Sequence, residues 1–275
     1  MNGPQIHLLP DGRLHLNHGP IDLICQAWGD DAGIQAAYRR AALRFAGLLG
    51  ELVAELPALR SENGALQGPI AGVMARAVAP FRPAFITPMA AVAGAVAEAV
   101  LAAMVSPAIR RAYVNNGGDI ALHLAPGQSL TSAIATSPHR FAIRAEDGVR
   151  GIATSGWRGR SFSFGIADSV TVLARTASMA DAAATMIANQ LDLPGHPAIR
   201  RAAANSLASD TDLGDRLVTV GVGALTTTEV ARALDRGASA AQAFLSRGLI
   251  ISAALFLNSD LRTSGVRTLK EPEHA

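Results

Sequence analysis

Apolar and polar positions alternate along the first part of the chain and then change to a helical period. Over residues 5–28 the apolar positions come at every second residue or in short runs, separated by Asp11-Gly12 and His18-Gly19-Pro20. This pattern predicts two or three short strands joined by tight turns. From residue 31 to about residue 60 the apolar positions recur every three or four residues. That spacing predicts one long amphipathic helix.

The next stretch is rich first in proline and then in alanine. A second helix is predicted over residues 70–79. Thr87-Pro88 then predicts a new helix start, with the hydroxyl residue as N-cap and proline at the first helical position. The helix predicted over residues 89–104 is apolar on every side apart from Glu98. It is therefore expected to be buried, with Glu98 either paired or near an exit to solvent.

The second half of the chain alternates between short strand patterns and further helices. Strands are predicted at residues 113–115, 120–124, 132–135, 141–145, 151–153, 168–174, 216–222 and 249–257, and helices at residues 182–188, 197–206 and 226–247. Short strands at this spacing are typical of an antiparallel sheet. We therefore predict an α/β (α+β) fold, in which a mainly antiparallel sheet is packed by Ala-rich helices.

Composition limits the domain count and the partners. No linker composition divides the 275 residues, so one domain over residues 1–275 is predicted, with N-terminal strands in residues 1–30 and a loose tail over residues 260–275. The net charge is only +2, and no dense Lys/Arg block occurs, which argues against a nucleic-acid partner. A homo-oligomer is left open.

The single cysteine and the hydropathy pattern indicate the compartment. Cys25 alone cannot form a disulfide within one chain, which suits a reducing environment. The N-terminus shows no basic region followed by an apolar core, and no uncharged run is long enough to cross a bilayer. The sequence therefore predicts a cytoplasmic protein that does not contact the membrane.

The candidate chemistry begins with a run of turn-forming residues between two of the predicted strands, Asn115-Asn116-Gly117-Gly118-Asp119. Asn and Gly tolerate positive φ, so this turn can leave peptide N–H groups open to an anion. From these residues alone, an ordinary β-hairpin turn is favoured. The run is longer than a hairpin needs, however, and at least one of the two glycines is expected to have positive φ.

A second polar cluster follows the strand predicted at residues 151–153. Thr154, Ser155 and Gly156 are followed by a loop that carries Arg158 and Arg160 and ends before Asp168. Hydroxyls, glycines, arginines and aromatic residues together suit a ligand with a phosphate and a ring. The same residues also suit an exposed hairpin loop, and the two interpretations have about equal weight.

A third candidate lies at the start of the helix predicted at residues 182–188. Ser178 and Asp181 have the spacing of a capping box, which would give Asp181 a structural role. Asp181 and Thr185 also lie one turn apart on one helix face and offer two hard oxygen ligands for Mg²⁺. From this pair alone, the cap is favoured.

Taken together, these segments resemble the ApbE-like superfamily, best known for Mg²⁺-dependent FAD:protein FMN transferases. The resemblance covers most of the chain and is closest to a small uncharacterised branch. It implies an ApbE-like, T-fold-like domain. The segments that carry it are His18-Gly19-Pro20-Ile21-Asp22-Leu23, Phe85-Ile86-Thr87-Pro88-Met89-Ala90-Ala91-Val92-Ala93-Gly94, Asn115-Asn116-Gly117-Gly118-Asp119, Thr154-Ser155-Gly156 and Ala180-Asp181-Ala182-Ala183-Ala184-Thr185.

The resemblance implies roles for individual residues. The turn from Asn115 to Asp119, Asn116 included, would lie against a flavin nucleotide, FAD. Asp181 and Thr185 would bind Mg²⁺ together with a backbone carbonyl near Val92. Arg158 or Arg160 could contact phosphate.

The sequence also departs from the transferase pattern. A lysine is missing at Val92-Ala93-Gly94, and the region before Asp168 lacks the His and Asp-Pro segment, which leaves Asp168 as a substitute base. We expect a protein that binds FAD or a related phosphate-bearing ligand with Mg²⁺, as a transferase or a pyrophosphate-cleaving enzyme. The alternatives are a different small-molecule reaction on the same fold, or binding without catalysis. Ordinary flavinylation of a protein is not expected.

Overall fold

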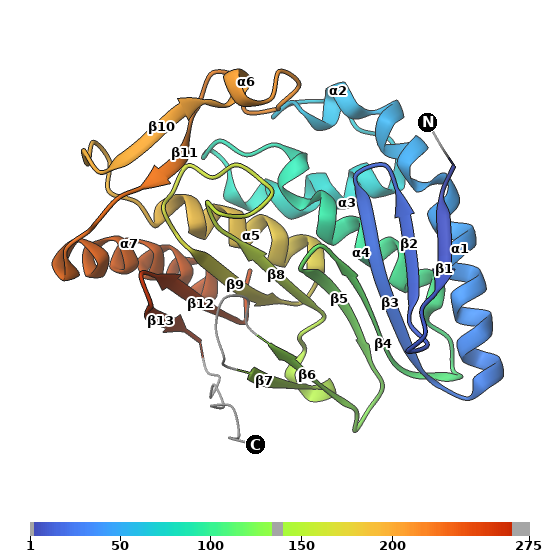
Figure 1. Cartoon of the computed structure of the whole chain (residues 1–275). Coiled ribbons are helices and arrows are strands. Elements are labelled where there is room, and N and C mark those ends of the chain that lie inside the picture. Colours follow the sequence, from blue (N-terminus) through green and yellow to red (C-terminus); the bar gives the residue numbers. More distant parts are fainter. Residues whose placement is uncertain (1–2, 134–139, 266–275) are drawn as a thin grey trace.

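One antiparallel sheet organises the molecule. The computed structural model describes residues 3–133 and 140–265, and within them nine strands follow the order β1-β2-β3-β4-β5-β8-β9-β12-β13 (Figure 1). All neighbouring pairs in this sheet are antiparallel. The strands are β1 (Gln5–Leu8), β2 (Leu14–His18), β3 (Ile21–Gly29), β4 (Ile109–Asn116), β5 (Asp119–Leu124), β8 (Gly151–Ser155), β9 (Ser169–Ala174), β12 (Ser252–Leu257) and β13 (Asp260–Ser264).

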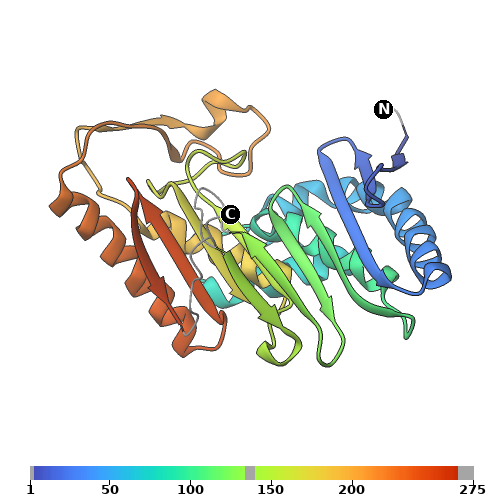
Figure 2. The same cartoon turned by 60° about the horizontal axis from the view of Figure 1, so that its bottom comes forward.

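The longer helices cover one face of this sheet (Figures 1 and 2). Helix α4 (Val92–Met104) packs on β4 and β5, and α5 (Ala177–Gln190) packs on β8 and β9. Helix α1 (Asp31–Ala54) contacts β3, and α7 (Thr227–Ser246) contacts β12 and β13. The predicted fold class is confirmed. The other helical segments are α2 (Leu56–Leu59), α3 (Pro69–Val78), α6 (Ala204–Leu207) and the 3-10 turns η1 (Ala79–Phe81), η2 (Pro88–Ala91) and η3 (Ala145–Asp147).

Small side chains bring α4 and α5 close together. Ala95, Ala97 and Ala183 are at most 1% exposed. A methyl group added at Gly94 would lie 2.3 Å from the carbonyl oxygen of Ala177, so the two backbones nearly touch there. The first turns of α4 and α5 can lie this close because Gly94 has no side chain.

A second, smaller core lies on the sheet face opposite the helices. It forms beneath the two-stranded ladder of β6 (Ser129–Ala133) and β7 (Arg140–Arg144). Leu122, Ile152 and Leu173 from the large sheet pack there with Phe141 and Ile143. The sheet therefore has apolar cover on both faces in this region.

Several predicted elements differ from the structure. Residues 197–206 were expected to be helical, but β10 (Ile199–Ala203) pairs with β11 (Leu217–Val222), because the ladder supplies hydrogen bonds that outweigh the helix propensity of the alanines. The tail predicted to be loose over residues 260–275 is wrong at its start, where β13 pairs with β12. Residues 266–275 lie outside the described residues, as does part of the strand predicted at residues 132–135.

Two predicted helices begin or end differently from the prediction. The helix expected over residues 31–60 is confirmed as α1, but it breaks at Glu55 and continues as the short α2. Thr87 precedes only the 3-10 turn η2 and does not cap it, since its hydroxyl donates instead to the carboxylate of Asp212. Within the described part of the chain, no helix has the length and apolar character needed to span a membrane.

Candidate functional site

The turn between β4 and β5 is a two-residue hairpin. Asn116 pairs with Asp119 across the ladder, and Gly117 and Gly118 form the loop with φ of +65° and +116°. The Gly118 N–H donates to the side-chain oxygen of Asn115 at 2.8 Å. Positive φ at both glycines confirms the conformational prediction, and the turn is no longer than a hairpin requires.

The hairpin end is joined to the first turn of α4. Asn116 is only 6% exposed, and its side-chain amide donates to the carbonyl oxygen of Ala93 at 3.2 Å. Asp119, half-buried on the same face of the sheet, accepts from the Thr154 N–H at 3.3 Å. The turn, α4 and the end of β8 therefore meet at one place.

Asp181 also joins this place, and it does not cap its helix. The N-cap of α5 is Thr176, whose hydroxyl accepts from the Met179 N–H at 3.2 Å. The Asp181 carboxylate accepts instead from the Gly94 N–H at 3.0 Å. The predicted Ser178–Asp181 capping box is therefore wrong, and Asp181 instead joins α5 to the first turn of α4.

Ser178 is hydrogen-bonded to Glu98, the one acid in the apolar helix α4. Both its N–H and its hydroxyl donate to the Glu98 carboxylate, at 2.7 and 2.9 Å. Glu98 is thus paired. The unusual acid in an Ala/Val helix was the sequence signal for this contact, although its partner could not be read from the pattern.

Asp119 and Asp181 both have a raised pKa. Burial raises the pKa of Asp119 to about 7, although the Thr154 N–H and the charge of Arg160 act in the opposite direction. Burial also raises the pKa of Asp181 well above its usual value, and the negative charges of Asp119 and Glu98 add to the effect. Burial therefore disfavours the ionised form of both acids, and a bound cation would offset that cost.

Arg160 brings a positive charge to the turn. A methyl group added at Gly117 would come within 2.2 Å of a guanidinium nitrogen of Arg160. Arg160 therefore lies directly against the glycine backbone, and its guanidinium could donate to a phosphate bound beside the turn.

The remaining residues of the predicted metal and nucleotide sites differ in their surroundings. Thr185 follows Asp181 by one helical turn and faces a small cavity that is also lined by Thr87 and Asp212. Val92 is the first residue of α4, next to the backbone groups of residues 93–94 that bond Asn116 and Asp181. The Thr154 hydroxyl bonds the Thr171 hydroxyl at 2.9 Å. Asp212 was not singled out from the sequence, since nothing nearby in the chain distinguishes it.

Asp168 and Arg158 have structural partners. The Asp168 carboxylate accepts from the Asn258 N–H at 2.8 Å and pairs with Arg158 at 3.2 Å. Gly156 packs against the backbone of Asp168, and Ser155 ends β8 just before it. These contacts join the loop after β8 to the turn between β12 and β13, and the structure shows no contact between Asp168 and Asp181.

No ready-made cluster of metal ligands occurs in residues 3–133 and 140–265, where no three His, Cys, Asp or Glu side chains group as a metal site. Asp181 and Asp119 nevertheless suit Mg²⁺, because this ion takes one or two carboxylates and completes its shell with water or phosphate oxygens. The raised pKa values of both acids fit a site that gains from a cation.

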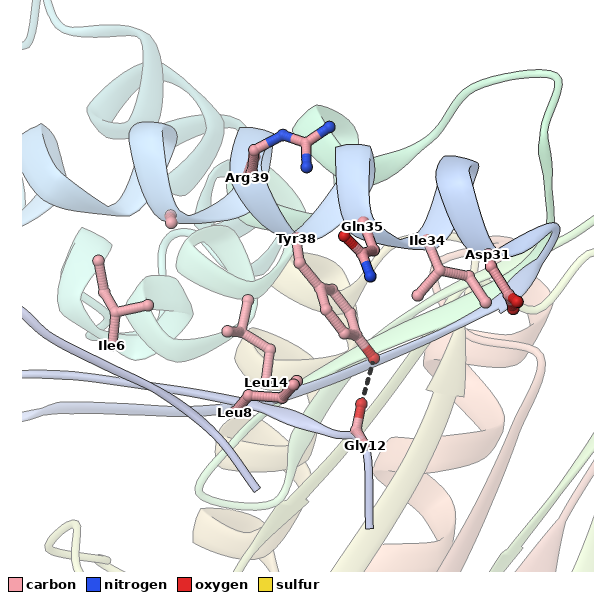
Figure 3. Close-up of a pocket in the computed structure, with 10 residues that line it drawn as sticks. Ile6, Leu8, Gly12, Leu14, Asp31, Ile34, Gln35, Tyr38 and Arg39 are labelled. Atoms are coloured by element: carbon pink, nitrogen blue, oxygen red, sulfur yellow. Dashed lines mark hydrogen bonds between the residues drawn. The ribbon is translucent and has the colours of Figure 1, made fainter. Parts of the chain in front are cut away.

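A separate groove lies between the N-terminal hairpin and α1 (Figure 3). Its walls include the apolar side chains of Ile6, Leu8 and Leu14, and the Tyr38 hydroxyl donates to the Gly12 carbonyl at 2.9 Å across it. None of the predicted site residues lines this groove.

Comparison with known proteins gives related sequences. A family model described as AbpE bacteria matches residues 6–263. A UPF0280 protein of Archaeoglobus fulgidus is 41% identical over 104 residues, covering 38% of this chain and 44% of the relative. A UPF0280 protein of Methanothermobacter thermautotrophicus is 41% identical over 134 residues, covering 46% and 51%. The matched segments thus span about half of the length of these curated relatives.

One solved structure is also similar. The apo form of the flavinyl transferase ApbE of Pseudomonas stutzeri aligns with 87% of this chain and 74% of its own, at 13% identity and a TM-score of 0.35.

Proposed function

The chain belongs to the family described as AbpE bacteria, and on that premise we propose that it binds Mg²⁺ together with the phosphate part of a flavin nucleotide, FAD or a close relative. The binding place is the junction of the β4–β5 turn with the first turns of α4 and α5. The flavin and Mg²⁺ in this proposal both come from the motif resemblance, and the two buried acids support the cation.

The observation that carries the proposal is the pair of acids at this junction. Asp119 on β5 accepts from the Thr154 N–H, and Asp181 on α5 accepts from the Gly94 N–H. Burial, with the negative charge of Asp119 added to it, raises the pKa of Asp181. Asp181 and Thr185, with the carbonyl near Val92, would hold the ion. A bound Mg²⁺ would polarise a phosphoryl oxygen and offset its charge. Asp119 would favour the ion electrostatically.

The phosphate side of the site would be formed by the turn and by Arg160. The close packing of Arg160 on Gly117 places a guanidinium where it can donate to phosphate oxygens. Thr154, Ser155 and Gly156 lead from the end of β8 into the same loop. Asn115 and Asn116 fix the turn by their hydrogen bonds to Gly118 and Ala93.

The reaction would be transfer from, or cleavage of, the pyrophosphate, with Asp168 or Arg158 assisting. One observation favours the second candidate, binding without turnover or another small-molecule reaction. The Asp168 carboxylate already accepts from the Asn258 N–H and pairs with Arg158, so it is not poised beside the acid pair. A base for an acceptor hydroxyl would have to come from a rearrangement of this contact.

Calorimetric titration with FAD tests the proposal, in Mg²⁺ and in EDTA. We expect binding to require Mg²⁺ and to weaken at least tenfold in Asp181→Asn, with a smaller loss in Thr185→Ala. Asp235→Asn is the matched control, since Asp235 is an exposed helical acid on α7. FAD binding that is equally strong in EDTA, or unchanged in Asp181→Asn, would contradict the metal assignment.

A further inference from the structure

A cavity of about 410 Å³ lies on the sheet face opposite the helices, between β3–β5 and the β6–β7 ladder. Its size falls in the range of small-molecule sites. The acid pair is on the other face of the sheet, so this cavity is separate from the proposed metal site. Asn115 also lines the cavity, and its side-chain oxygen already accepts from the Gly118 N–H.

The walls of the cavity are apolar and aromatic. Ile120, Leu122 and Ile152 rise from the sheet, and Trp28 and Tyr113 lie beside them with ring centroids 6.0 Å apart and tilted by 49°. Among residues 3–133 and 140–265, none of those that line the cavity is charged. Because burying a charged ligand without a partner is costly, these walls favour a neutral, flat molecule that can stack on aromatic rings.

The aromatic wall is held in place by neighbouring contacts. The Arg111 guanidinium lies 4.3 Å from the centre of the Trp28 ring and donates to the Ser129 carbonyl at 3.0 Å. The Tyr113 hydroxyl donates to the side-chain oxygen of Gln26 at 3.2 Å. These contacts hold the two rings in place without a ligand, and Arg111 also joins β4 to β6.

The wall opposite the sheet is formed by β6, whose backbone groups on the side away from β7 have no strand partner in the β6–β7 ladder. In the β6–β7 ladder, the Gln128 carbonyl accepts from the Ala145 N–H, so backbone groups two residues along, at Leu130, also point toward β7. Those of Ser129 and Thr131 then point the other way, which agrees with the bond from Arg111 to Ser129. Thr131 lines the cavity, and by this register its N–H and carbonyl point away from β7.

From this arrangement we propose that the cavity binds a neutral, planar heteroaromatic molecule of one or two rings, with a hydrogen-bond donor and an acceptor side by side on one edge. The ring packs on Ile120, Trp28 and Tyr113, and its polar edge pairs with the backbone of Thr131. Lactam and amino-heterocycle edges have this chemistry. The site is independent of the acid pair and of Mg²⁺.

Trp28 supplies a local reporter for the test. The chain has two tryptophans, Trp28 and Trp157. The buried indole nitrogen of Trp157 has no hydrogen-bond partner among the described residues, so Trp157→Phe removes no side-chain hydrogen bond and keeps an aromatic ring beside Arg158. In this variant all indole fluorescence comes from the cavity wall.

The probe is quinazolin-4(3H)-one, a neutral bicyclic lactam, titrated into Trp157→Phe in EDTA. We expect saturable quenching of Trp28. 3-Methylquinazolin-4-one has the same ring but lacks the donor, and we expect at least tenfold weaker binding. Quenching that rises linearly without saturation would overturn the site, and equal binding of the two compounds would overturn the assigned polar edge.

Two variants locate the binding. Adding Ile120→Phe should fill the cavity and abolish saturable quenching, whereas Ile24→Phe makes the same change on the same sheet face outside the cavity and should preserve it. If Ile120→Phe fails to fold by circular dichroism, Gln26→Leu, which removes the acceptor for Tyr113, should weaken binding several-fold instead. Equal quenching in the Ile24 variant and in the folded variant of the cavity wall would overturn the proposal.

Discussion

Replacing Asp119 by Asn should stabilise the metal-free protein at high pH and have little effect at low pH. The Asn side-chain oxygen can still accept from the Thr154 N–H, so the hydrogen bond is preserved while the negative charge is lost. The charged groups that act on this position are Asp181 from α5 and Arg160 from the loop after β8. The substitution therefore isolates the cost of holding an ionised carboxylate at this buried position.

The size of the effect follows from the pKa. The pKa of Asp119 rises from its usual 3.8 to about 7 in the folded protein. One tenfold change in proton affinity is worth about 1.4 kcal/mol, so the ionised carboxylate lowers the free energy of unfolding by up to about 4 kcal/mol above pH 7. The raised pKa means that the folded state binds the proton more tightly than the unfolded state. Its stabilising effect is therefore present below pH 4 and is lost as the pH rises through 7.

The assay is urea unfolding of both proteins in EDTA at intervals between pH 4.5 and pH 8. The free energy of unfolding of Asp119→Asn should exceed that of the parent by about 2–4 kcal/mol at pH 8, and the two should converge toward pH 4.5. Asp235→Asn, at an exposed position paired with Arg262 at 3.4 Å, should change the free energy by less than about 1 kcal/mol. Mg²⁺ at pH 8 should stabilise the parent more than Asp119→Asn.

Two results would refute this reasoning. A difference between the two proteins that does not vary with pH would show that Asp119 titrates normally in the folded state. A loss of stability in Asp119→Asn at pH 8 would show that the carboxylate is favourably paired, which would remove the unfavourable buried charge that a cation would offset.

Three further predictions concern the helix starts and the reaction. Gly94→Ala should lower the free energy of unfolding by about 1–3 kcal/mol, since its methyl would meet the Ala177 backbone, whereas Gly50→Ala, in open space on α1, should raise it by about 0.5–1 kcal/mol in the same urea assay. Thr176→Ala should cost about 1 kcal/mol as a lost N-cap while Mg²⁺-dependent titration of FAD stays unchanged, and a tenfold loss of binding there would contradict the separation of cap and site. Incubation with FAD, Mg²⁺ and a transferase acceptor peptide should leave the peptide mass unchanged, because Asp168 is engaged elsewhere; stoichiometric covalent flavin would restore the full transferase assignment.

Local signals in the sequence predicted the parts of this structure that depend on neighbouring residues. The two glycines between Asn116 and Asp119 have the expected positive φ, since a tight turn between two strands requires it there. The helix before Glu55 was predicted from a local signal as well, the recurrence of apolar positions every three or four residues. The strand at residues 199–203 was not predicted, because its partner strand β11 lies elsewhere in the chain.

The partners in the candidate site could not be predicted from spacing. Thr176 and Ser178 both precede α5 and both could cap it, and the choice is made by Glu98, which takes the N–H and hydroxyl of Ser178. Asp181 then bonds a backbone N–H at Gly94 that no local pattern identifies. The residue types of the site were visible in the sequence, but their pairing depends on how α4 and α5 pack.

These pairings have a consequence for the order in which the protein folds. The contacts that assemble the site join residues 23, 80 and 87 positions apart, from Asn116 to Ala93, from Ser178 to Glu98 and from Gly94 to Asp181. Closing such loops costs chain entropy that only the finished packing offsets, so these contacts form late. During synthesis, α4 leaves the ribosome well before α5. The Gly94 N–H in the first turn of α4 can therefore bond Asp181 only after most strands of the sheet have been made.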